Sequence, residues 1–285
     1  MNFNQKSKAL LEVNLAVLLF GISGLLGKFI SLNPFFIVLG RTFFASVTIF
    51  FILKFFKKKS PFQSTENKEK LLFSGVILTL HWVSFFYSIQ VSSVAIGLLT
   101  YSTFPIFVTF LEPLQLKEKI KFQDFTLALV VFIGLIFLVP SFDFENKNFI
   151  GVLSGILSGF TFAIFTLLNR NLVKTNSALN ISFVQNSVST LILLPILFFV
   201  KVEIKGSDLM LLVFLGVFCT ALAHTLFVKS LNQIKAQLAS LISALEPIYG
   251  ILLALIFLNE IPNFREAFGG ILILIASSFA IYKSN

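Results

Sequence analysis

The chain alternates long apolar stretches with short polar ones. A helix needs about 20 mostly apolar residues to cross the hydrocarbon core of a bilayer, and a scan with this length predicts ten such helices. The predicted spans are residues 10–29, 34–56, 71–90, 94–114, 122–140, 150–171, 180–200, 208–229, 236–258 and 264–282. Because most connections are short, successive helices are expected to be antiparallel neighbours, and no connection is long enough for a soluble domain.

The composition agrees with an integral membrane protein. Hydrophobic residues make up 56% of the chain and charged residues 12%, whereas soluble domains carry about 25% charged residues. The net charge of +9 does not indicate nucleic-acid binding here, because the basic residues lie between apolar stretches. The single cysteine, Cys219, allows no intramolecular disulfide. Lys6 and Lys8 precede an apolar run without a cleavage site, so an uncleaved first helix is expected.

Positive charge predicts the orientation. With the N-terminus inside, sixteen of the 22 Lys and Arg residues fall at cytoplasmic helix ends and five at outer ends, and Arg41 lies within a span. Basic residues concentrate on the cytoplasmic side of membrane proteins. The expected location is therefore a bacterial inner (plasma) membrane, with several passes and both termini in the cytoplasm.

An internal repeat relates the two halves of the chain. Residues 94–124 and 236–266 match at an offset of 142, which pairs Pro105 with Pro247 and Glu118 with Glu260. The same offset pairs Phe20 with Phe162, and Phe85 with Phe227. Five helices per copy is an odd number, so the copies enter the membrane in opposite orientations. The predicted fold is an all-α integral membrane protein of ten transmembrane helices in two inverted five-helix repeats, 1–145 and 146–285.

These features resemble the drug/metabolite transporter superfamily, and in particular its EamA-like branch. The resemblance rests on the paired proline and glutamate positions, on residues 85–107, on Gly21 and on Arg41, and it covers nearly the whole chain. It implies a carrier with a cavity between the halves. It does not imply one substrate, because the branch includes carriers of amino acids, their derivatives, drugs, sugars and other metabolites, in which export is the more common direction in bacteria.

Ionisable residues within predicted spans need a reason, because each costs at least about 2.5–3.5 kcal/mol to insert. Glu246 lies near the middle of the ninth span, just before Pro247. It could exchange protons or bind a cationic substrate group, or it could be a structural partner of Arg41. Arg41 could clamp a carboxylate or phosphate, or it could hold helices together. Its counterpart in the repeat is about Gln185, also polar, which fits a shared structural position.

His81 and Trp82 lie near the middle of the third span, and Tyr101 lies four residues before Pro105. Histidine can change charge in the physiological pH range, and aromatic faces suit cationic or aromatic ligands. These three side chains could line one pocket, or they could be ordinary core packing in a chain with 38 phenylalanines.

Gln185, Asn186 and His224 are further candidates for substrate binding, although amides within spans often only join helices. Pro105 and Pro247 are expected to bend their helices as structural hinges. Glu118 and Glu260 are expected to cap or tether helix ends. The glycines of the first and sixth spans are spaced for close helix contact.

The sequence contains no catalytic or nucleotide-binding motif and no metal-ligand spacing, so no enzyme activity, cofactor or metal is expected. The predicted function is secondary transport, by export or exchange, of a small polar metabolite such as an amino acid or derivative, coupled to protons or to a counter-transported solute. The alternative is a flippase for a lipid-linked intermediate. The repeat is broken at Glu246, which pairs with Phe104, and at Trp82, which pairs with His224. The substrate is expected beside these residues.

Overall fold

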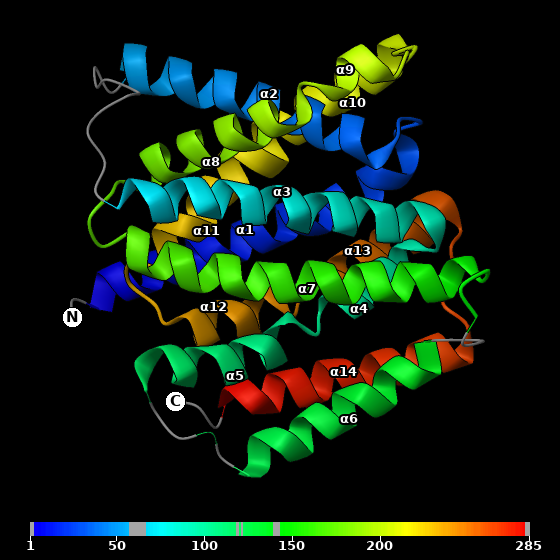
Figure 1. Ribbon diagram of the computed structural model, residues 1–285. Coiled ribbons are helices and arrows are strands. Elements are labelled where there is room, and N and C mark those ends of the chain that lie inside the picture. Colours follow the sequence, from blue (N-terminus) through cyan, green and yellow to red (C-terminus); the bar gives the residue numbers. More distant parts are fainter. Residues whose placement is uncertain (1–2, 57–66, 118–119, 121, 139–142, 283–285) are drawn as a thin grey trace.

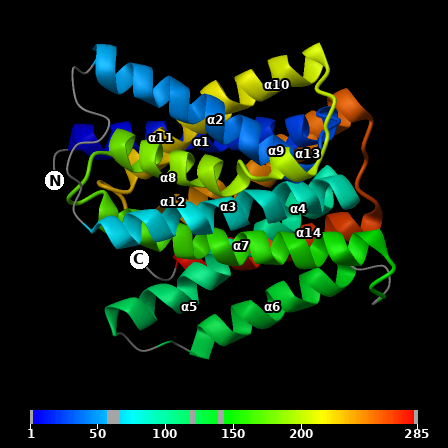
Figure 2. The same ribbon diagram turned by 45° about the horizontal axis from the view of Figure 1, so that its top comes forward.

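The computed structural model describes residues 3–56, 67–117, 120, 122–138 and 143–282. Within them the chain is helical and contains no strand. The elements are α1 (Phe3–Phe29), α2 (Pro34–Phe51), η1 (Ile52–Phe56), α3 (Lys68–Val91), α4 (Val94–Tyr101), α5 (Phe104–Leu116), α6 (Phe122–Leu138), α7 (Lys147–Leu172), α8 (Ala178–Leu193), α9 (Ile196–Phe199), α10 (Gly206–Gly216), η2 (Val217–Leu222), α11 (Ala223–Ser230), α12 (Ala236–Ser243), α13 (Glu246–Leu258) and α14 (Phe264–Tyr282). The long helices run back and forth in one bundle, and both termini lie at the same end of it (Figures 1 and 2).

Eight helical segments of the described chain are long and apolar enough to cross a membrane. They are Gln5–Phe29, Pro34–Phe56, Lys68–Val91, Val94–Gln115, Lys147–Leu172, Ala178–Phe199, Gly206–Ser230 and Leu238–Leu258. Residues Phe125–Leu138 form a shorter apolar helix, and α14 packs beside it (Figure 1). The all-α membrane fold is confirmed, whereas the count of ten spanning helices stays a prediction.

The outer surface of the bundle suits lipid rather than water. Many large apolar side chains point outward, among them Phe43, Phe73, Phe132, Phe198, Leu209 and Phe257. Exposing that much apolar area to water would cost about 25 cal/mol per Å², while a helix satisfies its backbone hydrogen bonds internally and so tolerates hydrocarbon. The chain is therefore a multi-pass membrane protein.

The two prolines break their helices at equivalent places. A proline has no backbone N–H, and its ring crowds the carbonyl four residues earlier. That earlier residue is Tyr101 for Pro105 and Ser243 for Pro247, and these are the last residues of α4 and α12. All four bounds of α4 and α5 shift by 142 residues onto those of α12 and α13. The pairs run in opposite directions through the bundle (Figure 1), as an inverted repeat requires.

The helices after the prolines also end in the same way. The residues that follow α5 and α13 are Lys117 and Asn259, with φ angles of 58° and 53°. The left-handed conformation is uncommon for residues other than glycine, and these two positions are again 142 residues apart. The structure thus repeats backbone detail that the side chains do not share. The exact boundary predicted between residues 145 and 146 stays a prediction.

The first helix of each half packs mainly against the other half. Helix α1 lies against α11 and α13, whereas α7 lies against α3, α4 and α5. Gly159 of α7 makes one of these contacts possible, since a Cβ atom there would lie 2.8 Å from the Tyr101 carbonyl oxygen. This close approach brings α7 against the break between α4 and α5.

Candidate functional site

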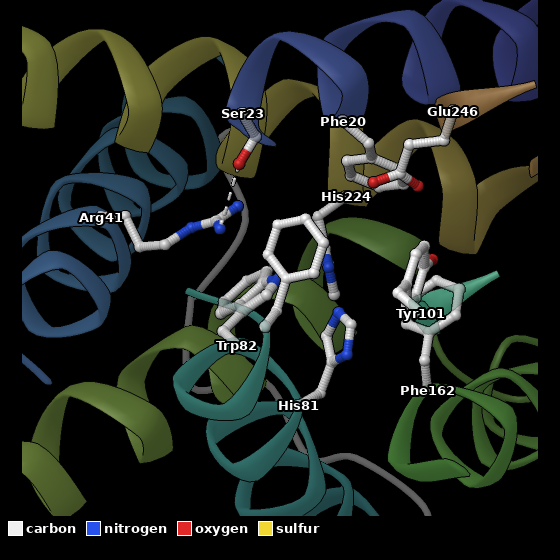
Figure 3. Close-up of a pocket in the computed structure, with 10 residues that line it drawn as sticks. Phe20, Ser23, Arg41, His81, Trp82, Tyr101, Phe162, His224 and Glu246 are labelled. Atoms are coloured by element: carbon white, nitrogen blue, oxygen red, sulfur yellow. Dashed lines mark hydrogen bonds between the residues drawn. The ribbon is translucent and has the colours of Figure 1, made fainter. Parts of the chain in front are cut away.

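A small cavity lies between helices of the two halves, and Figure 3 shows the side chains that line it. Its lining comes from α1, α2, α3, α4, α7, α11 and α13. The lining residues are Phe20, Ser23, Arg41, His81, Trp82, Phe85, Tyr101, Phe162, His224 and Glu246. The cavity has a volume of about 20 Å³, which is room for about one water molecule. Every residue of the lining is at most 8% exposed, so the cavity is buried inside the bundle.

Aromatic rings form most of the cavity wall. The Phe162 ring lies 4.7 Å from the His81 ring and 5.4 Å from the Tyr101 ring, measured between centroids. Phe20, Phe85 and Phe162 are cavity residues that the sequence pattern did not single out. The repeat pairs Phe20 with Phe162 at the offset of 142 and is the one signal that links two of them. Such a wall suits a ligand with an aromatic or cationic part.

Arg41 reaches the cavity from α2 and is 1% exposed. Its Nε donates to Thr220 Oγ1 at 2.9 Å, Nη1 donates to Ser23 Oγ at 3.3 Å, and Nη2 donates to the Cys219 carbonyl at 3.3 Å. The guanidinium lies 4.0 Å from the centre of the Trp82 ring. An arginine has five N–H donors, so these bonds leave one N–H on each terminal nitrogen.

The π-helix η2 presents the two groups that bind Arg41 from the second half. A π-turn interrupts the regular hydrogen bonding of an α-helix and often occurs at functional sites. Here Thr220 Oγ1 donates to the Leu215 carbonyl, five residues earlier, at 2.7 Å. The widened turn places Thr220 and the Cys219 carbonyl beside Arg41. Arg41 is thus both a tie between α1, α2 and η2 and a cation with donors to spare.

Glu246 faces the cavity from the first turn of α13 and is 3% exposed. The Tyr101 hydroxyl is oriented toward its carboxyl group and interacts with it (Figure 3). The other carboxylate oxygen, Oε2, is buried without a hydrogen-bond partner. The ion pairs within 4.0 Å in the described chain join other residues, so Glu246 and Arg41 share the cavity without pairing.

The two histidines contact the cavity in different ways. His81 Nδ1 lies 3.1 Å from the Ser158 carbonyl and 2.9 Å from Ser158 Oγ. A protonated Nδ1 donates to the Ser158 carbonyl, whereas an unprotonated Nδ1 accepts from the Ser158 hydroxyl. The His224 ring meets the Trp82 ring edge-on at 5.6 Å. Trp82 and His224 are repeat mates, so their contact marks the axis that relates the two halves.

Gln185 lies one layer behind the cavity. Its Nε2 donates to Ser74 Oγ at 2.7 Å and to Asn169 Oδ1 at 2.8 Å, and its Oε1 accepts from His224 Nε2 at 3.0 Å. It therefore joins α8 to α3, α7 and α11. Arg41 makes the equivalent link in the other half, from α2 to α1 and η2. Both residues thus join helices, and their equivalence within the repeat stays a prediction.

Asn186 does not line the cavity. It is fully buried, and its Nδ2 donates to the Ser182 carbonyl at 2.7 Å within its own helix. Its Oδ1 has no hydrogen-bond partner. The structure thus brings together six of the eight proposed binding residues, places Gln185 behind them, and leaves Asn186 apart.

These neighbours give a stability prediction. Replacing Gln185 by Leu leaves Asn169 Oδ1 and His224 Nε2 without the partner that Gln185 supplies. Each buried group without a partner costs about 1–3 kcal/mol. Ser74 Oγ loses one bond but still donates to the Leu71 carbonyl. We expect Gln185→Leu to lower the free energy of unfolding by about 3 kcal/mol or more, seen as a clear drop in the midpoint of thermal unfolding. Asn186→Leu is the matched control and should cost far less, because Asn186 makes only a local bond. Equal losses would contradict the junction role.

The remaining sequence candidates lie at helix ends. Pro105 and Pro247 occupy the first turns of α5 and α13, and their hinge role stays a prediction. Glu260 Oε1 accepts from the Ala95 amide at 3.2 Å and so caps α4, as expected. Glu118, like several lysines predicted to lie on the cytoplasmic side, is outside the described residues. Within the described chain no group of three His, Cys, Asp or Glu residues is placed to hold a metal ion.

A helical membrane protein with a buried, partly charged cavity between two inverted halves has an architecture that occurs in transporters. The sequence profile of the EamA-like transporter family matches residues 7–139 and 149–282. The chain belongs to the EamA-like transporter family, and thus to the drug/metabolite transporter superfamily, as the resemblance indicated. It is a transporter, and its substrate is a small molecule.

Three individual proteins of known sequence or structure share less than a quarter of their residues with this chain. An uncharacterised transporter of Bacillus subtilis, YxxF, is 23% identical over 98% of this chain and 91% of its own length. An S-adenosylmethionine uptake transporter of Rickettsia prowazekii is 23% identical over 93% of this chain and 89% of its own. A solved crystal structure matches with a TM-score of 0.67 and 18% identity over 96% of both chains. At that identity the likeness shows the fold alone.

Proposed function

We propose that this protein is a secondary carrier that exports or exchanges an amino acid or an amino-acid derivative. The observation that carries the proposal is the buried cavity that Arg41 and Glu246 share without pairing. A zwitterion supplies the missing partner of each. We further propose that the protein lies in a bacterial inner membrane with both termini in the cytoplasm, and that protons or a counter-transported solute drive transport.

The lining supports a role for each group. The free N–H groups of Arg41 suit a carboxylate, which accepts two parallel hydrogen bonds. The unpartnered oxygen of Glu246 suits an ammonium or another cation. The rings of Trp82, Tyr101 and Phe162 suit a cationic or aromatic body between these ends. Because the buried cavity holds about one water, binding a metabolite requires an open state, as alternating access demands.

S-adenosylmethionine belongs to the substrates that this site chemistry favours. It is an amino-acid derivative with a sulfonium cation and an aromatic base. Relatives at 23% identity carry that name, which supports testing this compound first and alongside simple amino acids.

The test combines binding and transport. We expect one chemical class in a metabolite panel to raise the melting temperature of the purified protein by several degrees, because a ligand at 100 times its Kd stabilises by about 2.7 kcal/mol. The same class should then show counterflow in proteoliposomes. Absence of counterflow for every amino acid, S-adenosylmethionine and related metabolite would refute the proposed substrate class.

A second candidate function is a flippase for a lipid-linked intermediate, and one observation favours it. An apolar groove of about 270 Å³ lies between α2, α9 and α10 and includes Gly40, the neighbour of Arg41. A lipid tail could lie there while its head group entered near Arg41. Rapid exchange of a water-soluble substrate would argue against this function.

A further inference from the structure

Two cations occupy matching positions at the ends of α1 and α7. Lys28 Nζ donates to the Ile89 and Ser92 carbonyls, both at 2.7 Å. Arg170 Nη1 donates to the Ile234 carbonyl at 2.9 Å. Arg170 follows Lys28 by 142 residues, and Ile234 follows Ser92 by the same number. The same contact is therefore made twice, with different side chains.

The two contacts lie at opposite ends of the bundle. Helix α1 ends at the right of Figure 1, beside the end of α3, whereas α7 ends at the left, beside the turn between α11 and α12. In an inverted repeat, one of these ends faces each side of the membrane. With the proposed cytoplasmic N-terminus, Arg170 lies at the cytoplasmic end and Lys28 at the outer end.

Each contact joins two packing groups of the bundle. Helix α1 packs mainly against α11 and α13 of the second half, yet Lys28 at its end binds α3 of the first half. Helix α7 packs mainly against α3, α4 and α5, yet Arg170 binds the turn before α12. A motion that separates these two groups at one end of the bundle must break the contact at that end.

The surroundings strengthen both contacts. The carbonyls at the end of α3 carry the negative end of a helix dipole, which favours a cation. Arg170 Nε also lies 4.0 Å from Glu112 Oε1 of α5. Glu260, which caps α4, interacts electrostatically with Lys28. Both cations are partly buried, so solvent screens them less than surface charges.

We propose that Lys28 and Arg170 are positioning residues that act as two latches, each holding the cavity closed toward one side of the membrane. Both contacts are formed in this structure, and the residues that line the cavity are buried. Release of one latch opens the cavity to its own side while the other stays shut. This inference rests on the proposed alternating access, but not on the identity of the substrate.

The test measures access to the cavity from each side. The single native cysteine is replaced by Cys219→Ala, and Ser23→Cys places a thiol in the cavity lining. A membrane-impermeant thiol reagent is then applied to each side of oriented proteoliposomes, without substrate. We expect Lys28→Met to raise labelling from the outer side by about tenfold and Arg170→Met to do so from the cytoplasmic side, since charged hydrogen bonds of this kind contribute about that factor.

The controls separate latching from general weakening. Lys28→Arg and Arg170→Lys keep donors and should label almost as slowly as the parent. Lys229→Met removes an exposed cation that pairs with Glu12, but Lys229 joins α1 to α11 within one packing group, so no side should gain access. Labelling that rises equally from both sides in both Met variants, or that is unchanged in both, overturns the proposal. If a Met variant does not give a monodisperse protein, the same comparison with Gln at that position decides.

A failure of the latches is distinct from a failure of the proposed function. The labelling needs no substrate, so it can succeed even if no amino acid is transported. If the Lys28→Met and Arg170→Met variants both open the same side, the latches are refuted. Counterflow by the unsubstituted protein can still be observed in that case, and the proposed function then stands.

Discussion

Glu246→Gln is expected to abolish the pH dependence of transport while the protein still folds. Glutamine has nearly the same shape but cannot take up or release a proton, and it removes a buried carboxylate oxygen that has no partner. Substrate affinity should fall by at least about tenfold, since hydrogen bonds to charged groups contribute about 1.5–3 kcal/mol. Uptake into proteoliposomes measured across a pH series, with and without a pH gradient, checks both expectations.

Asp208→Asn is the matched control for this experiment. Asp208 is 2% exposed, and its Oδ2 is also buried without a partner, but it lies at the start of α10 and does not line the cavity. We expect its pH profile to match that of the parent. If the Glu246→Gln variant stays as proton-sensitive as the parent, Glu246 does not couple protons. Among the other titratable groups that face the cavity, His81 is then the next candidate, ahead of His224 and Tyr101.

Arg41→Lys is expected to impair both stability and binding. Lysine keeps the charge but cannot reach Thr220, Ser23 and the Cys219 carbonyl at once, nor stack as a plane on Trp82. We expect the free energy of unfolding to fall by about 2–4 kcal/mol, as breaking a buried polar network commonly does. Affinity for a carboxylate-bearing substrate should fall by about tenfold or more, because the two-pronged donor geometry is lost.

The two effects of Arg41→Lys can be told apart. Thermal unfolding reports on the helix junction, whereas binding at a temperature well below the transition reports on the substrate contact. Thr220→Val provides the comparison, because it removes a partner of Arg41 without touching the cation itself. Normal affinity combined with poor stability in Arg41→Lys would assign Arg41 to helix packing alone.

The fold could be predicted where the chemistry is local. Pro105 and Pro247 each lack an N–H, so the helix break at Tyr101 and Ser243 follows from their positions alone. A shared pocket for His81, Trp82 and Tyr101 was one of two interpretations, beside ordinary core packing. It rested on their places near the middle of spans, because such residues meet when the spans pack. Apolar length does not fix the number of spans, because Phe125–Leu138 is apolar but shorter than the spanning helices.

The site could not be fully predicted, for three physical reasons. Gln185 and Asn186 are adjacent polar residues, and successive side chains on a helix point about 100° apart. Gln185 therefore faces other helices and bonds to three of them, whereas Asn186 bonds only within its own helix. The sequence does not show which of the two faces the other helices. Phe162 belongs to a residue type used 38 times, so its presence in the cavity wall carried no signal of its own. The π-turn at η2 has no sequence signature here, and it contains the Cys219 carbonyl that accepts from Arg41.

Helices α1 and α7 each pack mainly against the opposite half, and this has a consequence for folding during synthesis. Helix α1 is synthesised well before its main partners, α11 and α13. Until then its inner face, including Ser23 and Phe20, meets lipid or a membrane insertase instead of protein. Neither half can complete its own packing, so assembly waits for nearly the whole chain. A protein shortened after its first half would leave that face uncovered and become a substrate for membrane quality control.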